Sequence, residues 1–134
     1  MSVWKKLACG LCASVWAYSS VAQAEIPKKL TEQQAYQLIH RAFGDLRGGS
    51  FEYGPGMDQN FYVYQGVGRA GTEGSFGFFS VNPWTGDIWD LWECHKLKRP
   101  RLLTLKSAVR HRFTPEELKQ YDRLSRLKPE CIVD

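Results

Sequence analysis

The residues that decide the fold run from Ser75 to Cys94, SFGFFSVNPWTGDIWDLWEC. Aromatic and β-branched residues at Ser75–Val81, and again at Ile88–Cys94, predict two strands. Between these strands Pro83 presets a turn and Gly86 supplies a positive φ, which keeps the connection tight. The stretch therefore predicts an antiparallel β-hairpin.

Two segments on the N-terminal side extend this sheet. Ser50–Tyr53 is a short run, and Phe61–Val67 has the aromatic and β-branched content of a strand. Ahead of them, Thr31-Glu32-Gln33-Gln34 fits a capping box, and apolar residues follow at helical spacing as far as Leu46. We expect one helix before the sheet, with Gly44 as its stop.

Two further helices are expected after the sheet. Leu102, Leu105, Val109 and Phe113 lie at helical spacing. The stretch Thr114–Glu117 is a second capping box with Pro at the first helical position, and an apolar stripe follows it. The predicted class is α+β: an N-terminal helix, a three- to four-stranded antiparallel sheet and two C-terminal helices, in one domain over residues 25–134.

The first 24 residues are typical of a secretory signal peptide. Lys5 and Lys6 precede an apolar run over Leu7–Ala17, and Ala22-Gln23-Ala24 is a small-residue cleavage site. The apolar run is too short for a membrane-spanning helix. We therefore expect cleavage before Glu25 and a periplasmic protein with no transmembrane segment after cleavage.

The cysteines fit this location. Cys94 and Cys131 are the two that remain once the leader is removed, and exported proteins favour pairing over free thiols. We expect a Cys94–Cys131 disulfide that ties the C-terminal tail to the middle of the fold. The alternative is a reactive thiol beside His95, which an oxidised cysteine cannot supply.

The charge of the chain is uneven. Removing the two lysines of the leader from the 18 basic residues leaves 16 against 14 acids, a net charge of +2. No acid lies between Glu93 and Glu116. This stretch is either the solvated face of a helix, or a surface for an anionic envelope component or an acidic protein. Export makes nucleic acid a poor candidate. The basic candidates are Lys96, Lys98, Arg99, Arg101, Arg110 and Arg112.

No pattern predicts a catalytic or metal site. The match to G-x-G-x-x-G at Gly66–Gly71 precedes a strand instead of a helix, so we interpret it as a loop between strands. The histidines lack metal-ligand spacing: His40, His95 and His111. We expect no metal and no cofactor. The acids of the last strand are interpreted as solvated charges: Asp87, Asp90 and Glu93.

Aromatic side chains give the stronger signal. Alternation puts Tyr62 and Tyr64 on one face of their strand, and Phe61 and Val63 on the other. Helices cover one face of such a sheet, and the second face is either an aromatic binding surface or is covered by the C-terminal helices. The partner-binding candidates are Tyr62, Tyr64, Trp84, Trp89 and Arg69, the last in the Gly66–Gly74 loop.

The hairpin resembles that of PepSY-like domains, whose second strand follows a turn with the pattern x-x-TG-[DE]-[VI]. The matching residues are Val81, Asn82, Thr85, Gly86, Asp87 and Ile88. The resemblance implies a cystatin-like helix-and-sheet layout and a role in inhibiting peptidases. With its small size and one expected disulfide, the chain also resembles periplasmic immunity proteins that neutralise wall-degrading toxins. The C-terminal helices and the disulfide depart from the PepSY pattern, so no functional residue carries over.

These observations predict a non-enzymatic periplasmic binding protein that inhibits or neutralises another protein of the cell envelope, such as a toxin or hydrolase. The alternative is an envelope module that binds an anionic polymer or lipid through the basic stretch. A third hypothesis is a hydrolase whose site has no recognisable motif.

Overall fold

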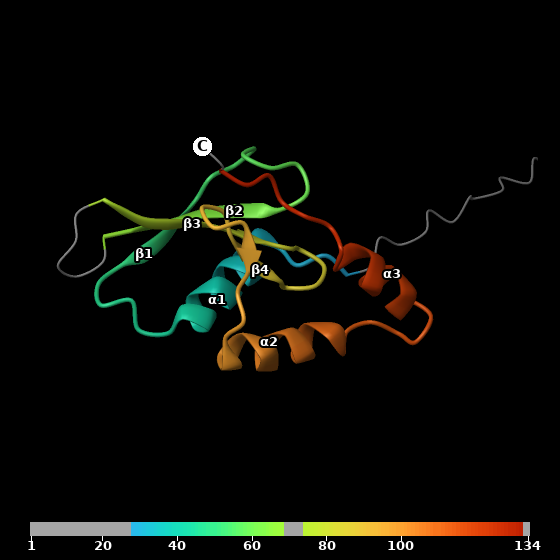
Figure 1. The fold of residues 1–134 in the computed structure, drawn as a ribbon. Helices are drawn as coiled ribbons and strands as arrows, with labels where there is room; N and C mark the ends of the chain where they lie inside the picture. Colours follow the sequence, from blue (N-terminus) through green and yellow to red (C-terminus); the bar gives the residue numbers. More distant parts are fainter. Residues whose placement is uncertain (1–27, 69–73, 133–134) are drawn as a thin grey trace, which may run out of the picture.

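The predicted hairpin lies within a five-stranded antiparallel sheet in a computed structural model, which describes residues 28–68 and 74–132 (Figure 1). The strands follow one another in chain order: β1 (Ser50–Tyr53), β2 (Tyr62–Val67), β3 (Ser75–Val81), β4 (Ile88–Asp90) and β5 (His95–Lys96). Helix α1 (Glu32–Phe43) precedes the sheet, and α2 (Pro100–Arg110) and α3 (Leu118–Leu124) follow it. The expected α+β class and element order are confirmed. The predicted leader, residues 1–24, lies outside the described residues, as does Arg69.

The sheet has one strand more than expected, because the predicted strand to Cys94 stops early. Asp90 Oδ1 accepts hydrogen bonds from the backbone N–H groups of Trp92 at 2.9 Å and Glu93 at 3.0 Å. Cys94 then takes a positive φ of 52°. This turn reverses the chain, so that β5 pairs antiparallel with β4.

The helix boundaries follow their capping residues. Gln34 N–H donates to Thr31 Oγ1 at 3.2 Å and Gln34 Oε1 accepts from Thr31 N–H at 2.9 Å, which confirms the capping box of α1. Gly44, with φ of 71°, ends this helix. Thr114 and Glu117 exchange the equivalent pair of hydrogen bonds ahead of α3. Helix α2 ends at Arg110, short of Phe113, and begins with Pro100 in its first turn.

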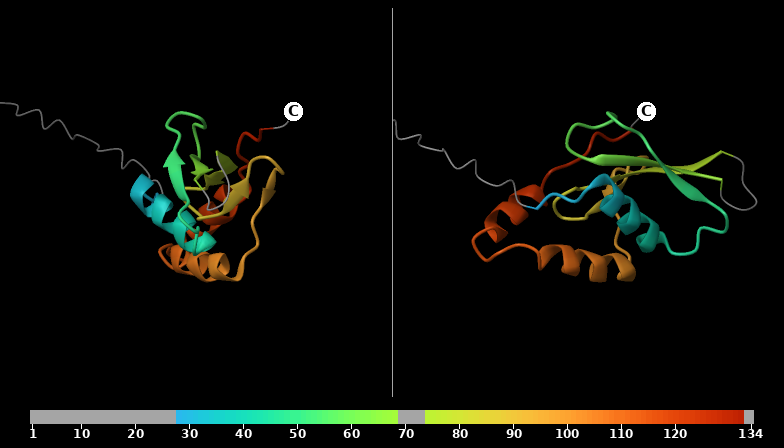
Figure 2. Two further views of the ribbon diagram at one scale, coloured as in Figure 1. Left: turned by 90° about the vertical axis from the view of Figure 1, so that its left-hand side faces the viewer. Right: turned by 180° about the vertical axis from the view of Figure 1, so that it is seen from behind.

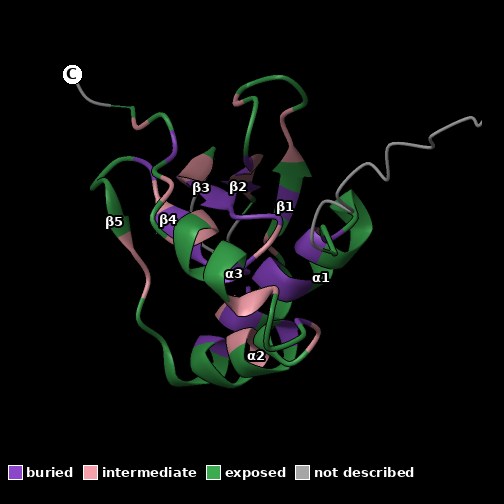
Figure 3. Cartoon of the chain, turned by 90° about the vertical axis from the view of Figure 1, so that its right-hand side faces the viewer, coloured by how far each residue is buried: buried purple, intermediate pink, exposed green. Residues whose placement is uncertain are grey.

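Helices α1 and α2 lie on the same face of the sheet (Figure 2). Figure 3 shows buried residues where helices and strands meet, with exposed residues around the outside. The main buried side chains of this inner core are Leu38, Ile39, Phe51, Tyr64, Phe79, Ile88, Leu102 and Val109. The inner core accounts for the apolar spacing of the predicted helices.

The tyrosines of β2 point toward these helices. Tyr64 is fully buried, and its hydroxyl donates to the carbonyl of Glu32 at 2.9 Å; Tyr62 donates to the carbonyl of Leu30 at the same distance. Burial, with a smaller contribution from Glu32, raises the pKa of Tyr64 above its ordinary value, so the hydroxyl stays a donor. The alternation was predicted correctly, but the expectation that Tyr64 presents its ring to a partner is wrong.

The outer face of the sheet is covered in part by the C-terminal tail, residues 125–132. The buried side chains on this outer face are Phe61, Val63, Trp89 and Leu91, and Phe78 and Leu127 pack against them. Ile132 N–H donates to the carbonyl of Leu91 at 2.9 Å, and Glu130 N–H donates to Asp58 Oδ2 at 3.0 Å. One of the two expectations was that the C-terminal helices cover this face. The tail, and not a helix, covers this half of the sheet.

The predicted disulfide fastens the tail. Cys94 and Cys131 are bonded, with their Cα atoms 5.5 Å apart and a sequence separation of 37. Cys94 ends the turn between β4 and β5, and Cys131 precedes the residue that pairs with Leu91. The bridge thus fixes the tail where it crosses the hairpin.

A buried ion pair joins the hairpin to the rest of the chain. Asp87 is only 3% exposed, and its carboxylate contacts the ammonium groups of Lys106 on α2 and Lys96 on β5. Thr85 Oγ1 donates to the same carboxylate at 2.8 Å. Asp87 was predicted to be a solvated acid, and this expectation is wrong.

The same network reaches the end of α3. Lys96 Nζ donates to the carbonyl of Ser125 at 2.7 Å, and Asn82 Nδ2 donates to the carbonyl of Leu124 at 2.8 Å. These carbonyls belong to the last turn of α3, where helices leave acceptors without intrahelical partners. Residues of the turn between β3 and β4 thereby position both α2 and α3.

Burial alone would raise the pKa of Asp87, but the hydrogen bonds from Lys106 and Thr85 and the charges of both lysines outweigh it. The pKa is therefore held below its ordinary value. A carboxyl whose pKa is lowered on folding contributes stability above its unfolded pKa, and this contribution is lost as the pH falls through the folded pKa.

No helix within the described part of the chain is long and apolar enough to cross a membrane.

Replacing one cysteine tests the attachment of the tail. We expect Cys131→Ser to lower Tm by roughly 12–30 °C, because a bridge over this separation contributes about 3–4 kcal/mol and each kcal/mol shifts Tm by about 4–8 °C in a small domain. Release of the tail also exposes Trp89 to water, so the intrinsic tryptophan emission should shift to the red. Cys94→Ser should behave alike, and reduction of the wild type should reproduce both. A Cys131→Ser protein that melts like the oxidised wild type contradicts the prediction.

Neutralising the buried acid tests the ion pair. We expect Asp87→Asn to reduce the free energy of unfolding by about 2–3 kcal/mol at pH 7, below the figure for fully buried pairs because both lysines are partly exposed. The stability gap to the wild type should begin to narrow below about pH 4, where the Asp87 carboxyl of the unfolded chain becomes protonated, and should close as the pH falls through the lower pKa of the folded state. Denaturant unfolding between pH 7 and pH 3 measures both, with Asp122→Asn as the exposed control. A gap that stays constant with pH rules out the ion pair as its source.

Candidate partner-binding cleft

The structure separates the four predicted aromatic contact residues into two groups. Tyr64 lies in the inner core and Trp89 is 7% exposed. Both were expected to contact a partner, but neither offers a full ring to one. Tyr62 and Trp84 are half-buried. Lys29 Nζ lies 5.7 Å from the centre of the Tyr62 ring and 5.4 Å from that of Trp84. Tyr62 and Trp84 therefore form a small surface cluster with Lys29, which no sequence pattern indicated.

The predicted basic stretch does not form one continuous surface. Lys96 is bound to Asp87 and to the carbonyl of Ser125, as described above. Arg112 donates to the carbonyl of Lys28 at 2.9 Å. The guanidinium of Arg110 lies 5.8 Å from the centre of the Tyr121 ring. These three basic candidates thus make contacts within the chain.

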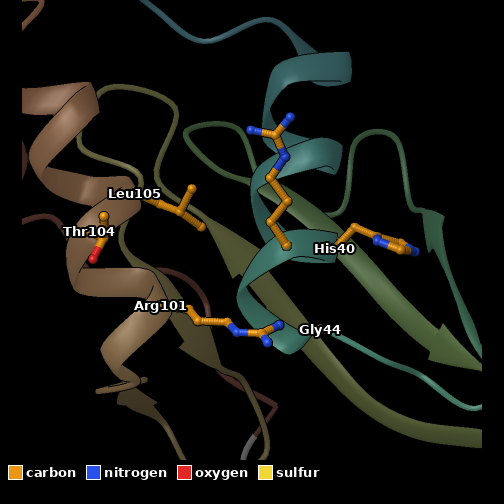
Figure 4. Close-up of a pocket in the computed structure, with 6 residues that line it drawn as sticks. His40, Gly44, Arg101, Thr104 and Leu105 are labelled. Carbon is orange, nitrogen blue, oxygen red and sulfur yellow. The ribbon is translucent and has the colours of Figure 1, made fainter.

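Arg101 lies at the end of α1. Its side chain extends from α2 toward Gly44, while the ring of His40 points away from α2 (Figure 4). A cation in this position interacts favourably with the negative end of the helix dipole. The depression of about 450 Å³ between the two helices is therefore partly occupied by a residue that stabilises α1.

The remaining basic candidates line a cleft at the β5 edge of the sheet. This basic cleft has a volume of about 760 Å³. It is formed by β4, β5, the segment leading to α2 and the tail, and its lining residues are Trp89, Cys94, His95, Lys96, Leu97, Lys98, Arg99 and Lys128. None of these described lining residues is acidic. The cleft thus brings four cationic side chains around one aromatic residue.

Each wall of the cleft is fixed by contacts already present. Cys94 is held by the disulfide, and Leu97 N–H donates to the carbonyl of Ile88 at 2.8 Å. The Lys96 ammonium lies 5.6 Å from the centre of the Trp89 ring, and the Arg99 guanidinium lies 4.4 Å from that of Phe43. Lys98 and Lys128 are exposed, and no ion pair involves either within the described residues. These two are the cations best placed to meet a partner.

The chemistry of this cleft is that of an anion receptor. Lysine and arginine are donors without acceptors, and they match carboxylate or phosphate oxygens. The indole Nε1 of Trp89 is buried and has no acceptor among the described residues. An incoming acidic side chain would bring acceptors to the exposed ammonium groups of Lys98 and Lys128.

Lys128 lines the cleft but belongs to none of the patterns that the sequence offered. It lies three positions before Cys131, so the predicted disulfide already implied that it comes close to the segment after Cys94.

Other groups with potential chemistry are dispersed. His95 faces Glu93 at 3.3 Å on the surface, and His111 Nδ1 lies 2.7 Å from the carbonyl of Ser107. Both described cysteines are joined to each other. Within residues 28–68 and 74–132, no three His, Cys, Asp or Glu side chains are grouped so as to hold a metal ion.

Comparisons with known proteins give one structural similarity. No family model and no curated protein matches the chain. A solved structure described as a type VI secretion system effector-immunity complex from Pseudomonas protegens matches 72% of this chain and 90% of its own, with 25% sequence identity and a TM-score of 0.48. A TM-score below 0.5 does not establish a shared fold, and the match assigns this chain neither role in such a pair.

Proposed function

We propose that this protein is a non-enzymatic, periplasmic binding protein of the immunity type, which neutralises a toxin or hydrolase of the cell envelope by seating an acidic segment of that protein in the basic cleft. The observation that carries the proposal is the cleft itself, whose described lining residues include four cationic side chains and no acid, beside a wall held by a disulfide. A disulfide is typical of proteins outside the cytoplasm.

Rigidity is the property that suits this role. A cleft whose walls are already ordered loses little conformational entropy when a partner binds, so more of the contact energy appears as affinity. The disulfide and the Asp87 network order these walls in the absence of any partner. Long-range attraction between unlike charges also accelerates encounter, which favours a protein that must intercept a toxin.

A discrete cleft favours a protein segment over an extended polymer. Binding to a polymer or a lipid surface is supported by a broad strip of accessible cations. Here Lys96, Arg110 and Arg112 make contacts within the chain, and Arg101 lies against α1. The accessible charge is concentrated where β5 and the tail meet.

Reversing the two accessible lysines tests the proposal. We expect Lys98→Glu/Lys128→Glu to weaken partner binding at least tenfold without a large loss of stability, because both side chains are exposed and repulsion replaces attraction. Arg99 is left unchanged, because it stacks on Phe43. Lys119→Glu/Arg123→Glu, on α3, is the control with the same change of charge.

The measurement has two stages. The wild type and both variants are immobilised and exposed to envelope extract, and a protein retained by the wild type and control alone is identified and purified. Its affinity is then measured by calorimetry at two salt concentrations, and its lytic activity is assayed with each variant. The proposal requires stoichiometric inhibition by the wild type and loss of inhibition by the cleft variant. Equal retention on all three proteins refutes it, and retention of anionic polymer alone favours the envelope module.

A further inference from the structure

The opposite edge of the sheet carries a different set of groups. Strand β1 pairs with β2 on one side, and no described strand pairs with its other side. In Figure 3, β1 is the outermost strand on the side of the sheet where α1 lies. Its backbone is therefore an edge at which another strand can be added.

The register shows which backbone groups face outward. Gly54 N–H donates to the carbonyl of Val63 at 2.9 Å, and Tyr53 lies opposite Tyr64, so Gly54 and Val63 are a hydrogen-bonded pair. Antiparallel strands alternate between hydrogen-bonded and non-hydrogen-bonded pairs. Glu52 therefore bonds toward β2, while the N–H and C=O groups of Phe51 and Tyr53 point away from the sheet.

A groove runs beside this edge. It has a volume of about 640 Å³ and lies between the first turns of α1 and β1, lined by Thr31, Glu32, Gln33, Tyr36, Phe51 and Tyr53. Side chains of an added strand opposite Phe51 and Tyr53 would point to the same face as those two residues, where this groove lies. The two outward-facing backbone positions and the groove are thus in register with each other.

The charge at this edge identifies the occupant. Glu32 lines the groove, Glu52 is exposed on β1, and no basic residue is among the described lining residues. Pairing of β1 with its counterpart in a second copy, centred on Glu52, would put two carboxylates directly opposite each other, which is unfavourable. A basic segment of a different protein fits, with lysine or arginine opposite Glu52.

We propose that β1 binds an extended segment of a partner protein as an added antiparallel strand, with apolar side chains in the groove and basic side chains beside Glu52. The proposal names a second interaction surface, separate from the basic cleft. Backbone hydrogen bonds supply affinity at such an edge, and the alternate side chains supply specificity.

A synthetic peptide tests this pairing. The probe is acetyl-Lys-Val-Lys-Val-Lys-Val-Lys-amide, and the readout is amide hydrogen exchange of the full exported protein by NMR. Exchange of the Phe51 and Tyr53 amides should slow at least tenfold when the peptide saturates. The Glu52 amide, already bonded within the sheet, should change little and serves as an internal reference.

Three comparisons make the result decisive. Methylating the backbone nitrogens of the three valines should weaken binding at least tenfold, because these N–H groups face β1. Methylating the backbone nitrogens of the lysines, which face away from β1, should be tolerated. Glu52→Lys should weaken binding at least fivefold, with the exposed Glu116→Lys as control. Lys98→Glu/Lys128→Glu should bind the peptide like the wild type, so failure of the basic cleft would leave this result untouched. Unchanged exchange at Phe51 and Tyr53 with millimolar peptide overturns the proposal, as does protection that follows dimerisation of the protein alone.

Discussion

The carboxylate of Asp87 is the group on which the rest of the structure depends. It lies in the turn between β3 and β4 and attracts one lysine from β5 and another from α2. Lys96 passes the connection on to the last turn of α3, and Asn82 in the same turn reaches a neighbouring carbonyl. One short turn therefore positions three elements that come later in the chain. A buried carboxylate is tolerated only with such partners, so each of these contacts depends on the others.

This network also decides which charges remain for binding. Lys96 and Lys106 belong to the basic stretch in sequence, but their ammonium groups are directed to Asp87. Lys98, two residues beyond Lys96, is left exposed, and the disulfide brings Lys128 to the same cleft. The charge that the cleft offers to a partner thus comes mainly from lysines that are not paired with Asp87. The ion pair acts through the folded state, whereas the disulfide also restricts the unfolded chain.

Local patterns predicted what local physics controls. The Thr31 capping box, the Pro83–Gly86 turn and the single possible cysteine pairing each depend on neighbouring residues or on elimination, and the structure agrees with them. Alternation also grouped Tyr62 with Tyr64 correctly, but period-two spacing cannot tell which face receives the helices. The position of Asp87 depends on Lys106, 19 positions away on a helix that no strand pattern mentions. For the same reason Lys128 could be found only through the disulfide, because the long-range bridge and not the local sequence places it.

The arrangement of the sheet gives the molecule two unlike edges. Strands β1 and β5 are its outermost members, with glutamates beside β1 and lysines beside β5. The net charge of +2 for residues 25–134 does not show this separation, because a sum takes no account of where the charges lie. Approach of a charged partner responds to the local field and not to the total, so an acidic segment is drawn to one edge and a basic segment to the other. A partner that carries both would be oriented as it approaches, and the three strands between β1 and β5 would fix the distance that its two segments must span.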